Sequence, residues 1–192
     1  MKIYLWLGTL AVLFCLQGNA VTARDIRNDT TPTILTYGFR IMELERARNV
    51  VAQKYGFRFF TVAGCIVNQQ LMDSINKEND ATYAILEKQL GKNWEKRFDN
   101  EVEKVKKIQY RIEALAMKEA YIIAKQQELA KHNNNLYFLI TPLPNSREWE
   151  VKAYGWETEE YTEQMIFYKM KADLRRKKIE LLSSKVEKMP VD

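Results

Sequence analysis

The stretch WEKRFDNEVEKVKKIQYRIEALAMKEAYIIAKQQELAK, residues 94–131, decides the fold that we expect from this sequence. This stretch predicts one long helix with an apolar seam, because its apolar residues recur every seven positions. At 1.5 Å per residue the helix would be roughly 57 Å long, so it needs a partner helix to cover the seam. The seam residues form two sets offset by three positions: Phe98, Val105 and Ile112, and Ile108, Leu115, Ile122 and Leu129.

Residues 158–188 are predicted to supply that partner helix. Thr158 is a suitable N-cap, and Glu159 and Glu160 follow it in the first turn, where the helix dipole favours acids. Glu119 on the first seam and Arg175 on the second are charges on otherwise apolar stripes, so we expect them to approach each other. The apolar residues of this second helix again repeat by seven: Met165, Ala172, Ile179 and Val186.

Two strands are predicted between the long helices. Residues 136–140, LYFLI, are apolar on both faces, which is typical of an interior strand. In residues 148–153 apolar and charged residues alternate, which is typical of a strand with one solvated face. We expect these strands to form a β-hairpin, so that the chain reverses and the two helices pack antiparallel.

The N-terminal part of the domain is predicted to hold shorter elements. Apolar residues at helical spacing predict a helix over residues 41–55, and the aromatic run 57–63 predicts a strand. Two short helices are expected at 66–75 and 79–90, with Asn79 as the N-cap of the second. The predicted fold class is therefore α+β and mostly helical, with a small, mostly antiparallel sheet.

Residues 1–20 match a cleavable secretory signal, with an early lysine, an apolar run and small residues before Ala20. Cleavage near Ala20/Val21 would leave a flexible lead-in over residues 21–37 and a single domain over 38–192. We expect no stable transmembrane anchor, because the apolar run is shorter than the roughly 20 residues that a bilayer needs. The expected location is periplasmic or extracellular, and cysteine scarcity favours a bacterial periplasm.

Composition excludes several classes of function. Removing residues 1–20 takes one Lys and no acid from the chain, so 30 − 1 = 29 basic residues face 25 acidic ones, a charge of +4. This balance does not indicate nucleic-acid binding. We predict no metal site, because one His and one Cys cannot make a zinc site. We predict no cofactor, since the sequence lacks a Gly-rich phosphate loop.

Cys65 and His132 are the only pair that suggests covalent chemistry. Cys65 lies between a predicted strand and a predicted helix, as the nucleophile of a papain-like thiol hydrolase does, and His132 could be its base. The neighbours of Cys65 are apolar, however, and such surroundings leave a thiol inert. We therefore favour Cys65 as a buried filler and commit to no catalytic residue.

Two surfaces are candidates for binding. Aromatic residues around the hairpin could line a ligand or partner surface: Trp149, Tyr154, Trp156 and Tyr161. A basic run gives a weaker case for an anionic envelope surface: Arg175, Arg176, Lys177 and Lys178.

The function that we expect is that of an exported cell-envelope protein without enzymatic activity. It would bind another protein, or a second copy of itself, through its long helices or its aromatic hairpin. One alternative is a thiol hydrolase that uses Cys65 and His132. The other is a periplasmic chaperone or carrier that holds an apolar client.

Overall fold

The structure is a computed structural model, and it describes residues 30–38, 42–144, 146–156 and 163–190. The chain divides into two units, residues 1–30 and 31–192, and the fold described below belongs to the second. The predicted leader, the cleavage point at Ala20/Val21 and most of the predicted lead-in lie outside the described residues.

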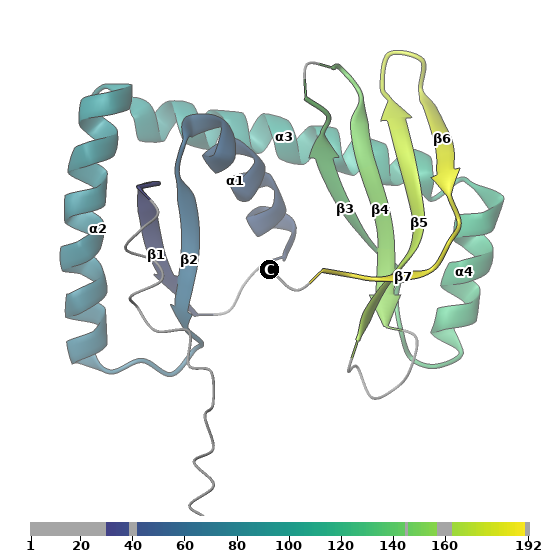
Figure 1. Cartoon of the computed structure of the whole chain (residues 1–192), viewed down its shortest axis with the longest axis horizontal. Coiled ribbons are helices and arrows are strands. Elements are labelled where there is room, and N and C mark those ends of the chain that lie inside the picture. Colours follow the sequence, from purple (N-terminus) through teal and green to yellow (C-terminus); the bar gives the residue numbers. More distant parts are fainter. Residues whose placement is uncertain (1–29, 39–41, 145, 157–162, 191–192) are drawn as a thin grey trace, which may run out of the picture. The chain divides into compact units, whose positions relative to one another are not determined.

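Helices and strands are mixed along the chain, which confirms the α+β class (Figure 1). The N-terminal elements are β1 (Thr33–Tyr37), α1 (Met42–Tyr55), β2 (Arg58–Ala63) and α2 (Gln69–Leu90). Two further helices follow, α3 (Trp94–Ala116) and α4 (Ala120–Ala130). The C-terminal elements are β3 (Tyr137–Pro142), β4 (Trp149–Trp156), β5 (Gln164–Asp173), β6 (Lys178–Ser183) and β7 (Glu187–Lys188). Within the described part of the chain, no helix is long and apolar enough to cross a membrane.

β1 and β2 form a two-stranded parallel sheet, and α1 connects them. The prediction of a flexible lead-in that extends to residue 37 is therefore wrong for residues 33–37. These residues, TILTY, are rich in β-branched and aromatic side chains, which pack well on a pleated surface. Ile34 becomes buried when β1 pairs with β2, so the strand depends on a partner that is distant in sequence.

The second sheet is antiparallel in the order β3-β4-β5-β6, and β7 also pairs with β5. Within the predicted helix 158–188, residues 163–188 are described, and they form β5, β6 and β7. The prediction of two long antiparallel helices is therefore wrong. In β5 the buried Met170 and Ala172 alternate with the half-buried Lys169 and Lys171, a period of two that fits a strand.

The predicted helix 94–131 is broken into α3 and α4. The backbone of Glu119 is extended, with φ −72° and ψ 129°, and α4 begins after it. Ala116 before the break and Ile122 after it are both fully buried in one core. The bend thus allows α3 and α4 to bury apolar residues in the same core, which one straight helix of this length would not do along its whole length.

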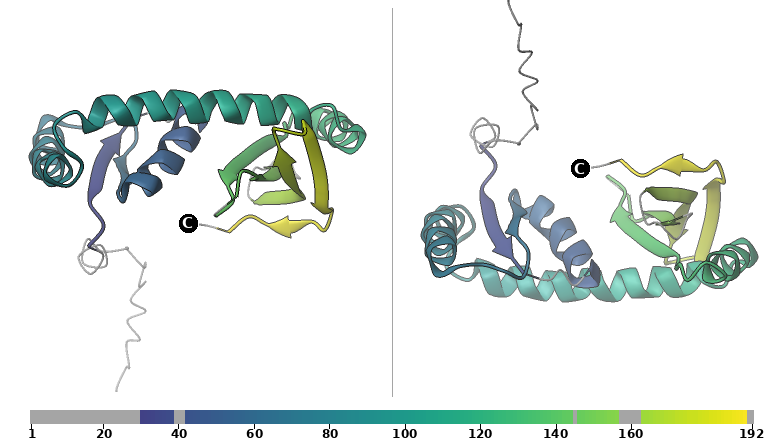
Figure 2. Two further views of the ribbon diagram at one scale, coloured as in Figure 1. Left: turned by 90° about the horizontal axis from the view of Figure 1, so that it is seen from above. Right: turned by 90° about the horizontal axis from the view of Figure 1, so that it is seen from below.

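Two hydrophobic cores hold the fold, and α3 contributes to both of them. The first core lies among α1, the β1–β2 sheet and the first half of α3, where Phe57, Trp94 and Phe98 pack their rings together. The second lies between α4, the last part of α3 and one face of the five-stranded sheet. Figure 2 shows α3 passing the β1–β2 sheet and then the five-stranded sheet.

Candidate functional site

The structure does not bring Cys65 and His132 together. Cys65 directly follows β2, which packs near Phe98, whereas His132 directly follows α4, which packs near Ile112. Phe98 and Ile112 are roughly 21 Å apart along α3 at 1.5 Å per residue. Figures 1 and 2 agree that β2 and α4 lie at different ends of α3. The arrangement of these elements gives no support to a catalytic pair of Cys65 and His132.

The prediction that Cys65 is a buried filler is also wrong, because the thiol is exposed. The residue lies in a bend between β2 and α2, and its neighbour Ile66 is 96% exposed. The apolar neighbours in sequence suggested burial, but this bend projects them into solvent. His132 is exposed as well, and its backbone N–H donates to the carbonyl of Leu129 at the end of α4.

The predicted aromatic surface is divided between the two faces of the sheet. Trp149 packs against the second core, whereas Tyr154 and Trp156 lie close to Tyr137, with ring centroids 5.8 Å and 5.5 Å from it. Tyr161 lies outside the described residues. The hydroxyl of Tyr154, a largely buried residue, accepts a hydrogen bond from Nη2 of Arg46 at 3.2 Å, which links the sheet to α1.

The predicted basic run is a turn between two strands, not the face of a helix. Residues 174–177 connect β5 to β6, and Lys178 begins β6. The helix that was to bring Arg175 opposite Glu119 is absent, so the basis of that ion-pair prediction is gone. Asp173 holds the turn, because its Oδ1 accepts hydrogen bonds from the backbone N–H groups of Arg175 and Arg176.

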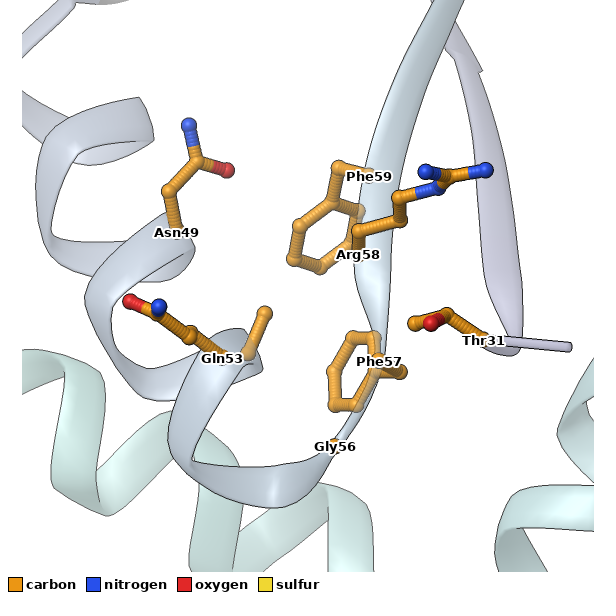
Figure 3. Close-up of a pocket in the computed structure, with 8 residues that line it drawn as sticks. Thr31, Asn49, Gln53, Gly56, Phe57, Arg58 and Phe59 are labelled. Atoms are coloured by element: carbon orange, nitrogen blue, oxygen red, sulfur yellow. The ribbon is translucent and has the colours of Figure 1, made fainter. Parts of the chain in front are cut away.

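A concave surface runs along α1. A cavity of about 530 Å³ lies between α1 and β2, and Figure 3 shows Asn49 on α1 across from Phe59 on β2. A second cavity of about 270 Å³ lies between α1 and β3, where it reaches Tyr154. Asn49 and Gln53, one helical turn apart, line both cavities, and Figure 3 shows the Gln53 amide turned away from β2. We call this pair of cavities the α1 groove.

The edge of β2 that faces α1 has no strand beside it in the described residues. The backbone N–H of Arg58 donates to Pro32 on the β1 side, and that of Phe57 donates to Ala52 of α1. Because peptide groups alternate along a strand, the N–H and C=O of Phe59 also face α1. The α1 groove thus has the backbone of a strand along one wall.

Other strand edges are closed by side chains. Asn79 and Thr82 of α2 bond to the outer edge of β1, where Thr82 donates to the carbonyl of Thr33 at 3.1 Å. Nε2 of Gln109 donates to the carbonyl of Ile140 in β3 at 2.9 Å. An uncovered strand edge is a template for pairing with another chain. The edge of β2 is such a template and has a cavity beside it.

Charged residues around the groove are held in place by neighbours. Arg48 lies over the ring of Phe59, 4.1 Å from its centroid, and bonds to Glu45 at 3.4 Å. Nε of Arg58 donates to Oγ1 of Thr33 at 3.0 Å. A groove with fixed walls loses less conformational entropy on binding than a flexible one.

The groove offers amide groups that can bind a ligand. Within the described ranges, no group of three or more His, Cys, Asp or Glu side chains could hold a metal ion. The amide of Asn49 has donors and an acceptor, which match the groups of a peptide backbone. Sequence reasoning missed this site, because no local pattern shows that Asn49 of α1 and Phe59 of β2 line the same cavity.

Comparison of the chain with models of protein families, with curated proteins and with solved structures gave no match.

Proposed function

We propose that this chain is an exported, non-enzymatic protein that binds an extended segment of another protein in the α1 groove. The observation that carries the proposal is the edge of β2 that faces α1, which has no strand beside it among the described residues. The cavity beside that edge holds about 530 Å³, within the range of ligand pockets.

In the proposed complex the partner segment adds to β2 as a further strand. The N–H and C=O of Phe59 pair with its backbone, and the Asn49 amide contacts it from α1. Hydrogen bonds along the main chain provide affinity in this type of recognition, while pockets for alternate side chains provide specificity. The rings of Phe57 and Phe59 line the cavity and offer apolar contacts to those side chains.

Self-association through the helical seam has less support than the groove. Seam residues of α3 and α4 are buried inside the chain: Phe98 in the first core, and Ile112, Ile122 and Leu129 in the second. The other seam residues, Val105, Ile108 and Leu115, are partly buried, so the seam leaves less apolar surface for a second copy.

Export rests on the pattern of residues 1–20. A periplasmic or extracellular location would bring the groove into contact with envelope proteins. N-terminal sequencing of the chain recovered from its native host tests this part of the proposal. The expected result is a first residue of Val21 or one close to it, and an intact Met1 would contradict it.

Binding is tested with a random peptide library displayed on phage and selected on the chain that begins at Val21. Peptides that bind are then titrated against Asn49→Ala and Gln53→Ala, with Asn76→Ala and Gln89→Ala on the exposed surface of α2 as matched controls. Loss of one hydrogen bond should weaken binding roughly fivefold for Asn49→Ala, and the controls should bind like the wild type.

Strand addition also predicts how the peptide backbone behaves. N-methylation of alternate peptide residues should abolish binding, because those residues can no longer donate to β2. Hydrogen exchange at Phe59 should slow when the peptide is bound. Peptides that bind equally well after methylation of each residue in turn would refute the strand-addition mode.

A chaperone or carrier of an apolar client is the second candidate. It is favoured by exposed apolar side chains on and after the β1–β2 sheet: Tyr37, Phe60, Val62 and Ile66. Suppression of the aggregation of an unfolded client protein, lost in Phe60→Ser but kept in Asn49→Ala, would favour this function over the groove.

A further inference from the structure

The turn between β5 and β6 presents a compact group of cations to solvent. Arg175, Arg176, Lys177 and Lys178 are all exposed, and we call them the basic tip. The tip has a defined shape, because Asp173 Oδ1 accepts from the N–H groups of Arg175 at 2.9 Å and Arg176 at 3.0 Å. Lys177 adopts a φ of +50°, which reverses the chain into β6.

The basic tip keeps most of its charge. Within the described part of the chain, only Arg176 among the four has an ion pair, to Asp173 at 3.5 Å. Four cations and one carboxylate give the turn a charge of 4 − 1 = +3. Glu180, the next acid along β6, is paired with Lys171 of β5. Lys171 also pairs with Glu148, so these three neighbours add 1 − 2 = −1. The tip together with them keeps a charge of 3 − 1 = +2.

Exposed leucines lie directly beyond the basic tip on β6. The register of β5 against β6 shifts between Lys169, which pairs with Ser183, and Met170, which pairs with Leu181. Leu182 therefore has no partner on β5, as in a β-bulge, and bulges redirect side chains. Leu181 is 44% exposed and Leu182 is 55% exposed. At about 3.3 Å per residue, they lie roughly 10–13 Å along β6 from Lys178.

We propose that the basic tip and these leucines dock the protein on the surface of an anionic phospholipid bilayer. The cations would contact lipid phosphates, and Leu181 and Leu182 would enter the boundary between head groups and acyl chains. Attraction to anionic lipids and burial of apolar area together determine interfacial binding. A soluble polyanion could pair with the cations, but it has no apolar region in which the two leucines could be buried. The presence of both cations and exposed leucines therefore favours a membrane over a soluble polyanion.

This docking surface is distinct from the α1 groove and does not rest on the proposed peptide binding. Its test is co-sedimentation of the chain that begins at Val21 with phosphatidylcholine vesicles and with equimolar phosphatidylcholine–phosphatidylglycerol vesicles. Circular dichroism checks that each variant is folded. The wild type should bind the anionic vesicles, bind the neutral ones much less, and lose binding as salt rises.

Two pairs of matched variants separate the contributions. Lys177→Gln with Lys178→Gln should lower binding roughly 25-fold, about fivefold per cation, whereas Lys77→Gln with Lys88→Gln on α2 should leave it near the wild-type level. Leu182→Ser should lower it severalfold, and Ile85→Ser, which replaces a side chain 48% exposed on α2, should not.

Three results would overturn the proposal. The first is no preference for anionic vesicles. The second is equal loss of binding in the tip variant and in its α2 control. The third is binding that Leu182→Ser leaves unchanged and that dextran sulfate reproduces with the same dependence on Lys177 and Lys178. That last result would identify the tip as a site for soluble polyanions.

Discussion

The side chain of Asn79 on α2 makes with Leu35 on β1 the same two hydrogen bonds that a neighbouring strand would make. Its Oδ1 accepts from the Leu35 N–H at 2.8 Å, and its Nδ2 donates to the Leu35 carbonyl at 2.9 Å. One side chain thus closes the outer edge of the β1–β2 sheet at its centre. A two-stranded sheet is marginal by itself, so this contact supports the strand that leads to α1 and the groove.

Replacement of Asn79 by Ala should destabilise the protein by about 1–3 kcal/mol, because the peptide groups of Leu35 lose their partners. Asn76→Ala is the control, since Asn76 is exposed on the same helix and the change in helix propensity is the same. Urea unfolding followed by circular dichroism measures both. Equal stability of the two variants would show that the Leu35 contact contributes nothing.

Gly155→Ala should destabilise the protein by about 1–3 kcal/mol through overpacking. A Cβ at Gly155 would lie 2.7 Å from the backbone carbonyl oxygen of Asn135, which cannot move aside as a flexible side chain could. Gly64→Ala is the control, because a Cβ there meets no atom within 4 Å. Thermal unfolding compares the two, and a melting temperature of Gly155→Ala at or above that of Gly64→Ala would contradict the prediction.

Tyr121→Phe should be as stable as the wild type at pH 7, or more stable. The Tyr121 hydroxyl is buried without a hydrogen-bond partner among the described residues, so its removal leaves no group unsatisfied. The ring packs against Tyr168, with centroids 5.0 Å apart, and phenylalanine keeps that contact. A clear loss of stability in urea at pH 7 would show that the hydroxyl has a partner.

The same tyrosine predicts a dependence on alkaline pH. Burial, and then the charge of Glu119 and the neighbouring Tyr168, raise the pKa of Tyr121 from 10.0 to about 12. The unfolded chain therefore releases this proton at lower pH than the folded chain, and stability falls between about pH 10 and 12. Tyr121→Phe should lose less stability over that range than the wild type, and Tyr37→Phe controls for the loss of one phenol. Parallel curves for wild type and Tyr121→Phe would disprove the shift.

Cys65 should react with Ellman's reagent in the native protein, because its thiol is exposed. The chain that begins at Val21 is suitable, since it lacks Cys15 and holds one cysteine. The rate should be close to that in urea, and Cys65→Ser should change the free energy of unfolding by less than about 0.5 kcal/mol. A thiol that reacts only after unfolding would place Cys65 in the interior after all.

Patterns that depend on neighbours in sequence predicted much of the fold. Helical spacing located α1, the aromatic run located β2, and the alternation after residue 148 located β4. The seven-residue repeat after Met165 was misleading, since β5 and β6 are strands. Their partners are β4 and each other, and no local pattern identifies those contacts. The better signal was the alternation of Lys169, Met170, Lys171 and Ala172.

The candidate site was harder to predict than the fold. Asn79 was expected to cap a helix, but it lies within α2, and Asn68 is the cap, accepting from the Leu71 N–H at 2.8 Å. Which strand edge stays uncovered depends on where α2 and α3 pack. The sequence therefore contains Asn49 and Phe59 without any sign that they face one space.

Because α3 contributes to both cores, the unfolding of one core is coupled to the unfolding of the other. Trp94 and Phe98 complete the first core, and Ile112 and Ala116 complete the second, so neither half of the chain has a full interior without this helix. Loss of one half would expose the apolar side chains that α3 buries in it, on the same helix that completes the core of the other half. Residues 31–190 should therefore melt in one cooperative transition. A cut between α4 and β3 divides only the second core, so the C-terminal fragment should fold only when it is recombined with the fragment that holds α3 and α4.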